Sequence, residues 1–543
     1  MSKYIFVSGG VISGIGKGIS AASIGVLLKS YGYKITMLKA DPYLNVDAGT
    51  MNPSEHGETF VLEDGFETDM DIGSYERFVN ESFSRPNSMT CGAVLEKVIK
   101  DERSLAYDGK WVSLDYHVPN EAISWIKSVA KSSKAEITIV EIGGTVGEIA
   151  NGLFLEVNKI MKIEAPNDVI HVHLSYLPVP NTLGEMKSKP VQVSTQLLNT
   201  HGIHPDFLIA RSEYELDRIR IEKLSRYCYV PVNHIVSAVD TDCIYDVPVN
   251  FKRANLGINI LKKLNLKPKK TSIIDKWVKK TERMKKIKKE INIGIIGRSP
   301  KSGKFDLKDS YVSVLEAINH ASWEKMSKPN IHWIEAEGFR SKEKLREKLL
   351  EMDAIVVLQG IGKEDMEGKI RAVEIARESK LPFLGLGYGF QIAVVEYARN
   401  VCKIKDATTQ EIDSKGSLIM YRRDTTDGRR LGSYPCKVKS GSVLESLYKK
   451  YKSSLFNTQP TVLERHRNSY EFNNEYKNIL EDKGLIFSSI STDRKLVEAV
   501  EIPKEKHPFF IATLYHPELK TRFILPHPIF MGFIEAAIKR SKR

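Results

Sequence analysis

The chain has 543 residues, of which 42% are hydrophobic and 27% are charged, so it is long enough for two or three domains with cores of their own. It contains no apolar run of about 18 residues and its N-terminus lacks the pattern of a signal peptide, so we expect no membrane partner. The five cysteines are scattered without a C-x-x-C pair, which predicts reduced thiols in a cytoplasmic protein.

The net charge of +13 has two interpretations, binding of nucleic acid or binding of anionic substrates on a lysine-rich surface. Much of the excess charge lies in residues 262–290. This stretch has neither interleaved aromatic residues nor a known nucleic-acid-binding motif. We therefore expect anionic substrates and no nucleic acid.

Apolar strands alternate with helical patterns over the first 260 residues, as in a parallel α/β sheet. The buried strands predicted here are residues 3–10, 34–43, 136–144, 168–178 and 205–212. Each is followed by a polar turn or a helix. This part is predicted to form one domain, residues 1–267.

A basic helix and linker are predicted for residues 268–290, and a second α/β series follows in residues 291–543. Its strands are expected at residues 291–298, 353–360, 382–387 and 509–518. The predicted fold class is therefore α/β, with two doubly wound domains.

A glycine-rich stretch, "SGGVISGIGKGIS" (8–20), lies between the first strand and a helical run. Glycine amides, a helix N-terminus and a lysine, here Lys17, are what a phosphate-binding loop requires. The match to the standard loop is imperfect, because Gly10 is one residue too far from Gly16 and because position 18 is Gly18 instead of Ser or Thr. The alternative is a glycine-rich turn that binds nothing.

Acidic residues would have to replace the missing hydroxyl at position 18 as ligands of Mg²⁺. Residues 63–78 are acidic and punctuated by glycine, and Glu141 ends the strand predicted at 136–144, where ligands bind in open α/β sheets. A single glutamate at a strand end is as often structural as functional.

The stretch "PFLGLGYGFQ" (382–391) has the pattern of a nucleophile elbow, a sharp turn between a strand and a helix. Its apex is Gly387, which has no side chain to act as a nucleophile. The stretch "YHPE" places His516 and Glu518 two residues apart, although such a sequence on its own is more often a plain turn.

Several long motifs together resemble a known family. "SGGVISGIGKGISAASIG", "LKADPYLNVDAGTMNPSEHGETFVLEDGFETDMDIGSYERF", "VEIGGTVGE", "GEMKSKPVQ" and "VDTDCIYDVP" resemble the P-loop-type amidoligase domain of CTP synthases. "EGKIRAVEIARESKLPFLGLGYGFQ", "LERHRNSYEFN" and "LYHPE" resemble their class I glutamine amidotransferase domain. The resemblance implies a ligase of pyrimidine nucleotide biosynthesis that forms CTP from UTP, ATP and ammonia through a 4-phospho-UTP intermediate.

The resemblance also implies the residues of the synthetase site. Two catalytic lysines, Lys17 and Lys39, would surround the ATP phosphates, and Asp71 and Glu141 would hold Mg²⁺. The remaining family positions for ATP are Gly14, Ile15, Gly16, Gly18, Ile19, Arg211, Asp240 and Thr241. Those for UTP or the product CTP are Ser13, Glu148, Ile149, Ala150, Lys187, Ser188, Lys189, Pro190, Val191, Gln192 and Lys223.

Two further expectations concern assembly and regulation. In the family the UTP site is shared between subunits, which implies a homotetramer, and GTP acts as an effector of glutamine hydrolysis. Ala150 stands where the family has a second acidic residue that helps to bind CTP as inhibitor, so we expect altered feedback by CTP.

In the glutaminase half, the family positions are Gly360, Gly387, Gln391, Glu411, Ser469, His516 and Glu518. The family has cysteine where this chain has Gly387, and it has an arginine that holds the substrate carboxylate where this chain has Ser469. Gln359 replaces one glycine of the oxyanion loop. Cys402 and Cys436 lie too far along the chain to replace the nucleophile without rebuilding the domain.

These departures lead to the hypothesis of a CTP synthase that uses free ammonia and does not hydrolyse glutamine, with a separate glutaminase as one source of ammonia. The alternative is a catalytically inactive scaffold or regulatory subunit. The retained lysines and carboxylates argue against it. A generic P-loop ATPase is disfavoured by the long motifs of the UTP site.

Overall fold

The computed structural model describes residues 2–52, 57–180, 182, 184–269, 272–297, 301–302, 305–306, 308–339, 341–358, 366–422, 428–451, 461–493 and 495–542. The chain forms two compact units. Unit 1 comprises Met1–Thr50 and Thr68–Glu282, and unit 2 comprises Met51–Glu67 and Arg283–Arg543. Residues 51–67, expected in the first domain, thus group with unit 2.

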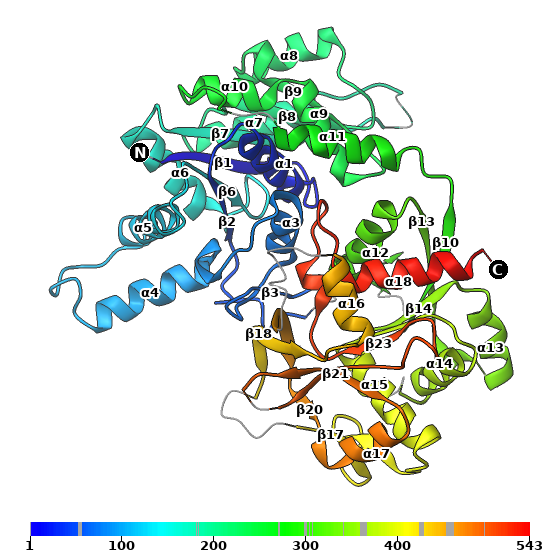
Figure 1. The fold of residues 1–543 in the computed structure, drawn as a ribbon. Helices are drawn as coiled ribbons and strands as arrows, with labels where there is room; N and C mark the ends of the chain where they lie inside the picture. The colour runs from blue at the N-terminus through cyan, green and yellow to red at the C-terminus, as the bar shows by residue number, and fades with distance from the viewer. Residues whose placement is uncertain are drawn as a thin grey trace. The chain divides into compact units, whose positions relative to one another are not determined.

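Unit 1 is built on a parallel sheet with the strand order β5-β2-β6-β1-β7-β8-β9 (Figure 1). All five strands predicted for this half are present, and β5 and β9 are additional. The bounds are β1 (Lys3–Gly10), β2 (Ile35–Asp41), β5 (Ser88–Thr90), β6 (Ile137–Ile142), β7 (Val169–Tyr176), β8 (Phe207–Ser212) and β9 (Ile235–Val239).

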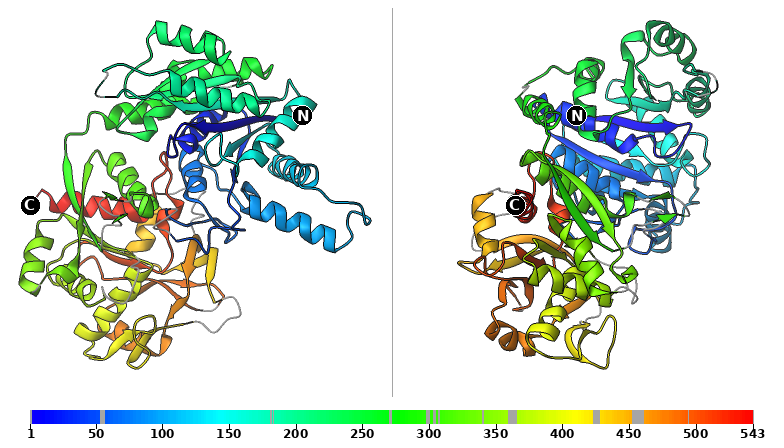
Figure 2. Two further views of the ribbon diagram at one scale, coloured as in Figure 1. Left: turned by 180° about the vertical axis from the view of Figure 1, so that it is seen from behind. Right: turned by 90° about the vertical axis from the view of Figure 1, so that its right-hand side faces the viewer.

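Helices cover both faces of this sheet, which makes the unit doubly wound (Figure 2). α4, α5 and α6 pack over one face, while α1 packs with α3, α9 and α10. Side chains cap the N-termini of several helices; Asp69 accepts from Asp71 N at the start of α3, and Thr90 accepts from Ala93 N at the start of α4. The bounds are α1 (Lys17–Ser30), α3 (Met70–Val79), α4 (Cys91–Arg103), α5 (His117–Ser132), α6 (Gly152–Glu164), α7 (Lys189–Thr200), α8 (Arg218–Cys228), α9 (Val247–Arg253), α10 (Leu256–Lys263) and α11 (Ser272–Met284).

Unit 2 contains a mixed sheet with the order β13-β10-β14-β15-β23-β22-β21-β18-β19. It is parallel from β13 to β23 and antiparallel beyond β23. The four predicted strands, β10, β14, β15 and β23, lie in the parallel part, and β13 at its edge is additional. The bounds are β10 (Glu290–Ile296), β13 (Lys328–Ile334), β14 (Ala354–Val357), β15 (Phe383–Leu386), β18 (Arg430–Val438), β19 (Thr461–Asn468), β21 (Ile486–Ser491), β22 (Val497–Glu501) and β23 (Phe510–Thr513).

Two apolar cores flank the sheet of unit 2. One lies under α12, α16 and α18, and the other lies under α13, α14 and α15. The bounds are α12 (Val312–Glu324), α13 (Lys342–Leu350), α14 (Met366–Glu378), α15 (Tyr388–Glu396), α16 (Val443–Lys450), α17 (Lys477–Asp482) and α18 (Pro528–Arg540), with small strands β3 (Phe60–Val61), β4 (Glu67–Thr68), β11 (Lys301–Ser302), β12 (Phe305–Asp306), β16 (Ala407–Thr409), β17 (Ser417–Arg422) and β20 (Tyr470–Phe472).

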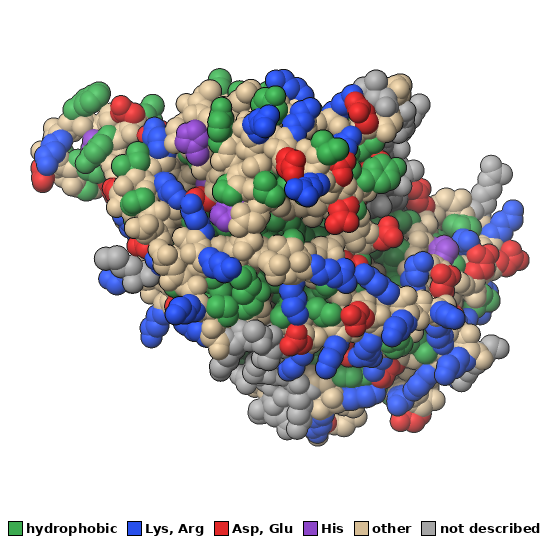
Figure 3. All heavy atoms as spheres, turned by 90° about the horizontal axis from the view of Figure 1, so that it is seen from above, with side chains coloured by type: hydrophobic (Ala, Val, Ile, Leu, Met, Phe, Trp, Pro, Cys, Tyr) green, Lys and Arg blue, Asp and Glu red, His purple; other side chains and the backbone are tan. Residues whose placement is uncertain are grey.

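Among the described residues, none of the helices combines the length and the apolar character that are needed to cross a membrane. Lysine and arginine side chains are frequent on the face drawn in Figure 3, where they are interspersed with acidic and apolar side chains.

Candidate functional site

The predicted phosphate loop connects β1 to α1 in unit 1. Gly16 is the N-cap of α1, and Lys17 is its first residue. The Nζ atom of Lys17 donates to the carbonyl oxygen of Gly144, at 2.8 Å, in the turn after β6. Because the amides of the first helical turn have no partner within the helix, the start of α1 suits an anion such as a phosphate.

Four charged side chains meet beside this loop, at the carboxyl ends of β2 and β6. Lys39 is buried and donates to Asp71, the second residue of α3. Its Nζ atom also lies 3.5 Å from Asp41 and 3.6 Å from Glu141. The three carboxylates therefore surround one buried lysine.

Burial and mutual repulsion set the charge state of this cluster. Burial raises the pKa of Asp41 to about 7, although Lys39 opposes the shift. Burial also raises the pKa of Glu141 and lowers that of Lys17. Burial alone would lower the pKa of Lys39, but the three neighbouring carboxylates raise it well above its usual value. Excess negative charge in a buried site favours an added cation.

The glycine at position 18 makes room for this cluster. A Cβ atom on Gly18 would lie 2.7 Å from Asp71 Oδ1 and 3.4 Å from Glu141 Oε2. The carboxylates thus occupy the space in which a standard loop places its Ser or Thr hydroxyl. Because oxygen donors are what Mg²⁺ prefers, the donor set of Asp41, Asp71 and Glu141 fits that ion.

A small cavity of about 100 Å³ lies beside the loop and gathers residues expected around the ATP nucleoside. Arg211 Nε donates to Asp240 Oδ1 at 2.8 Å at the edge of this cavity. The expected residues in its lining are Ile15, Gly16, Ile19, Arg211, Asp240 and Thr241. Gly14 lies next to them, with its carbonyl oxygen 3.4 Å from Arg211 Nη1.

The residues expected at the UTP phosphates collect at the start of α7 and on α8. Gln192 Nε2 donates to Ser188 Oγ at 3.1 Å. Lys187 donates to Glu185, and this contact, together with Arg220 and Lys223, lowers the pKa of Glu185. Lys189 and Pro190 are the first two residues of α7, and Val191, the third, is buried. Ser13, Glu148, Ile149 and Ala150 are exposed in two turns.

The elbow of unit 2 is present as a turn between β15 and α15. Gly387 is the N-cap of α15, with φ 55° and ψ −103°. A Cβ atom placed on Gly387 would point at His516, 2.9 Å from Cε1 and 3.2 Å from Nε2. The Nδ1 atom of His516 lies 2.7 Å from Glu518 Oε1. The structure therefore brings a histidine and its orienting carboxylate to an apex without a side chain.

The other expected glutaminase positions are only partly brought together. Gln391, on α15, donates from Nε2 to Glu411 Oε2 at 3.0 Å and accepts from Thr409 Oγ1 at 2.7 Å. Ser469 lies between β19 and β20. Burial raises the pKa of its neighbour Tyr470, and the nearby carboxylate of Glu411 raises it further. Gly360 and Gln359 lie outside the described residues.

Neither candidate cysteine lies at the elbow. Cys402 follows the C-terminal end of the helical region that begins with α15, and its Sγ atom faces the carbonyl oxygen of Ile479. Cys436 is buried in β18, and burial raises its pKa well above the usual value for a thiol. Both observations fit the expectation that neither replaces the missing nucleophile.

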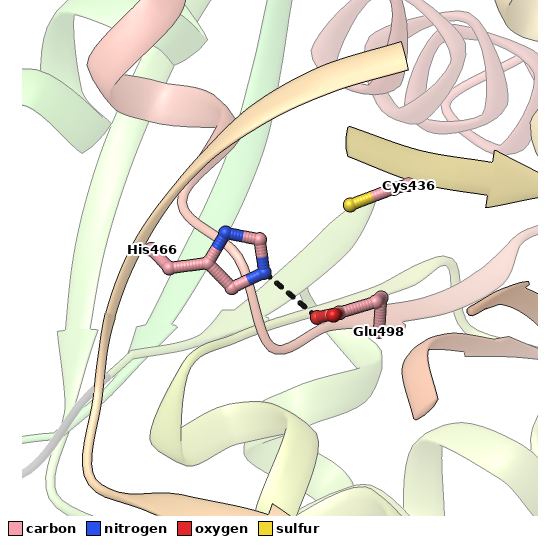
Figure 4. Close-up of side chains that lie close together, drawn as sticks. All are labelled: Cys436, His466 and Glu498. Carbon is pink, nitrogen blue, oxygen red and sulfur yellow. Dashed lines mark hydrogen bonds and ion pairs between the residues drawn. The ribbon is translucent and has the colours of Figure 1, made fainter. Parts of the chain in front are cut away.

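Cys436, His466 and Glu498 lie close together inside unit 2 (Figure 4). His466 Nε2 is 2.7 Å from Glu498 Oε2, and Arg430 donates to the other oxygen of Glu498 at 2.7 Å. The carboxylate is thus already engaged by a guanidinium and an imidazole, and the thiol holds its proton. We interpret these residues as a structural cluster that anchors β19.

Two groups of the cluster around Lys39 were not predicted from the sequence. Asp41 is two residues from Lys39 on β2, so the alternation of a strand places both on one face, and this signal could have found it. Tyr75, on α3, donates its hydroxyl to Glu141. Nothing in the sequence pattern distinguishes it from other buried tyrosines.

Comparisons with known proteins follow the same division of the chain. Residues 3–266 match the family model for the CTP synthase N-terminus, and residues 306–536 match the model for class-I glutamine amidotransferases. The chain is thus a synthetase joined to an amidotransferase-type domain. A CTP synthase of Prochlorococcus marinus (strain MIT 9312) is 42% identical over 99% of this chain and 98% of its own.

A second relative, the CTP synthase of Carboxydothermus hydrogenoformans, is 42% identical over the full length of both chains. This chain therefore belongs to the CTP synthase family. A solved structure titled as the glutaminase domain of a Trypanosoma brucei CTPS with bound acivicin is 29% identical and covers 46% of this chain and 94% of its own, with a TM-score of 0.41.

Proposed function

We propose that this protein forms CTP by ATP-dependent amination of UTP at C4 and takes the nitrogen from free ammonia. Ammonia is proposed as the nitrogen source because Gly387 stands at the apex of the elbow. A class I glutaminase needs a thiolate at the elbow to form its thioester, and here the apex beside His516 carries only hydrogen. The membership of the family supports the ligase activity.

The synthetase chemistry is assigned to unit 1. The γ-phosphoryl group of ATP is transferred to the 4-oxygen of UTP, releasing ADP; ammonia then attacks C4, phosphate leaves with that oxygen, and the added nitrogen loses protons to give the amine of CTP. Phosphoryl transfer depends mainly on positioning and on neutralising charge. Lys17 and Lys39 supply positive charge at the loop, where burial strengthens their effect.

Asp71 and Glu141 are the residues proposed to hold Mg²⁺, with Asp41 beside them. The ion would supply charge neutralisation on the phosphate oxygens. Lys39 contacts all three of these carboxylates. The same lysine can turn toward a phosphate once the carboxylates have another cation as partner.

Homotetramer formation is part of the proposal. Exposed apolar side chains on α4 and on its connection to α5 are candidates for the surface between subunits. They are Ile99, Leu105, Trp111, Leu114 and Tyr116, with Trp111 84% exposed. Light scattering coupled to gel filtration measures the assembly directly.

The test is an assay of purified protein with UTP, ATP and Mg²⁺ and with either ammonium or glutamine as nitrogen source. We expect CTP from ammonium and none from glutamine. A Lys17→Gln variant purified in parallel is the matched control, because a contaminating synthase from the expression host would make CTP from glutamine in both preparations. CTP from glutamine at a rate close to that from ammonium, absent in the control variant, would refute ammonia-only activity.

Two results would lead to different conclusions. Nucleotide binding without CTP formation from ammonium would favour an inactive scaffold or regulatory subunit. If ammonium supports the reaction, an added glutaminase should allow glutamine to replace it. GTP, the family's effector, is expected to leave the ammonium-dependent rate unchanged.

A further inference from the structure

A series of hydrogen bonds crosses the interior of unit 1 next to the phosphate loop. Ser194 Oγ lies 2.7 Å from His173 Nε2, and His173 Nδ1 lies 2.9 Å from Ser8 Oγ. The same hydroxyl of Ser8 lies 2.8 Å from His171 Nε2, and His171 Nδ1 lies 3.0 Å from Asn158 Oδ1. We call these five residues the serine–histidine chain. None of them is more than 3% exposed.

The serine–histidine chain joins four elements of unit 1. Ser194 belongs to α7, the two histidines to β7, Ser8 to β1 and Asn158 to α6. β1 and β7 are neighbouring parallel strands, and Ser8 stands opposite His173 in their register (Figure 1). Residues two apart on a strand point to one face, so both histidines project from the same face of the sheet. The chain therefore links two helices to the strand that leads into the phosphate loop.

The bonding pattern requires both imidazoles to be neutral. The amide oxygen of Asn158 faces His171 Nδ1, so this nitrogen donates and His171 Nε2 accepts the proton of the Ser8 hydroxyl. Ser8 Oγ in turn accepts from His173 Nδ1, which leaves His173 Nε2 to accept from Ser194. Burial lowers the pKa of both histidines to about 3, which keeps them neutral at neutral pH. Each bond thus depends on the direction of the next.

The chain also accounts for Gly10, which is out of register with a standard phosphate loop. A Cβ atom on Gly10 would lie 1.7 Å from Ser194 Oγ and 3.2 Å from His173 Cε1. A residue with a side chain would therefore displace the hydroxyl of Ser194 from its place beside His173. Gly10 is the last residue of β1. The start of the phosphate loop and α7 are thus in direct contact.

α7 carries residues that are proposed to bind UTP. Lys189 is its first residue and Gln192 its fourth, and Ser194 follows Gln192 by less than one turn. The buried side chains Val191 and Leu198 also hold α7 in the unit. Apolar packing is non-directional, whereas a hydrogen bond fixes both a distance and an angle. The bond of Ser194 therefore restricts how α7 can shift or rotate against β1 and β7.

We propose that the serine–histidine chain positions the UTP-binding start of α7 against the phosphate loop, so that UTP is aligned with the phosphates of ATP. Ser194, His173 and Ser8 are positioning residues, since they act through α7 and β1. The inference rests on the proposed function, which assigns α7 to UTP and the loop to ATP. Such alignment matters for phosphoryl transfer, because a misplacement of about 1 Å can cost on the order of 10²-fold in rate.

The test uses the full chain with Ser194→Ala and Ser8→Ala, alone and combined, and with Ser30→Ala as matched control. Ser30 is a buried serine of α1 whose hydroxyl donates to Leu27 O within the same helix, at 2.6 Å. Hydrogen exchange of the α7 amides is followed by mass spectrometry without nucleotide. Calorimetry with Mg²⁺ measures the binding of UTP and, separately, of the ATP analogue adenylyl imidodiphosphate.

Neither readout requires turnover, so the two proposals can fail separately. An unmodified protein that binds both nucleotides but makes no CTP from ammonium would contradict the proposed function. The exchange of α7 and the two affinities would still decide whether the serine–histidine chain positions the helix.

We expect Ser194→Ala to speed exchange at the start of α7 and to weaken UTP binding by about three- to tenfold, as for the loss of one buried hydrogen bond. The affinity for the ATP analogue should change by less than about twofold, because the phosphate loop remains attached to β1. Ser8→Ala should act in the same direction, and the double variant should be little worse, because both changes interrupt one chain.

Ser30→Ala should match the unmodified protein in both readouts. Unchanged α7 exchange and UTP affinity in Ser194→Ala would overturn the proposal. Equal losses of affinity for UTP and for the ATP analogue would also overturn it, because they would show a general loss of structure instead of a displaced α7.

Discussion

Gly18→Ser restores the hydroxyl of a standard phosphate loop, and we expect it to impair the enzyme. The added Cβ atom would lie 2.7 Å from Asp71 Oδ1, whereas ordinary contact begins at 3.4 Å, so the carboxylate must withdraw by about 0.7 Å. Displacing a catalytic group by about 1 Å can cost on the order of 10²-fold in rate. We therefore expect kcat/KM for ammonium-dependent CTP formation to fall by roughly ten- to a hundredfold.

The assay for this variant is CTP formation from UTP, ATP and ammonium over a range of Mg²⁺ concentrations. Gly338→Ser is the control, because an added Cβ atom there meets no atom within 4 Å among its neighbours in the structure. Excess Mg²⁺ should recover only part of the lost rate, since the ligand itself is displaced. A Gly18→Ser enzyme with more than half of the original rate would show that the glycine is not required by the carboxylates.

Two further predictions concern the elbow of unit 2 and two buried histidines of unit 1. Gly387→Cys should not restore glutamine-dependent CTP formation, because the new Cβ atom would be 2.9 Å from His516 Cε1; a glutamine-dependent rate near the ammonium rate would contradict this. In unit 1, burial lowers the pKa of His171 and His173 to about 3. The unfolded chain takes up these protons near pH 6.5, so the free energy of unfolding should fall as the pH drops from about 6.5 toward 3. At pH 5 the loss should be about 2 kcal/mol per histidine. Pulse proteolysis in urea measures the free energy of unfolding, which should depend less on pH in the double variant His171→Gln/His173→Gln than in the unmodified protein. The same pH dependence in both proteins would refute the argument.

The parallel strands were predictable because they are long apolar runs with turn residues at each end. The seven strands of unit 1 include two that the pattern did not reveal, and one of these, β5, has only three residues. The antiparallel part of unit 2 was also missed. Strands such as β19, "TVLERHRN", carry charged residues on both faces, and only tertiary partners such as Glu63 and Glu498 make such a strand stable.

The grouping of charged residues in unit 1 was predictable where spacing along one loop or strand decides the geometry. Lys17, Lys39 and Glu141 lie beside the loop as expected, and Asp71 joins them from α3. Contacts between segments distant in sequence were not predictable. The grouping of residues 51–67 with unit 2 depends on arginines about 400 positions away, and no local pattern indicates that pairing.

The backbone at Gly387 bears on the proposed absence of glutamine hydrolysis. Its φ of 55° with ψ of −103° is accessible to glycine but costs a residue with a side chain about 1–3 kcal/mol. A nucleophile held at such an apex stores that energy in the folded state. Glycine avoids this cost, so under the proposed function the domain without a nucleophile would be more stable than one that carries a side chain at this position. If ammonium is the nitrogen source, as proposed, that stability would oppose the return of a nucleophile to this position.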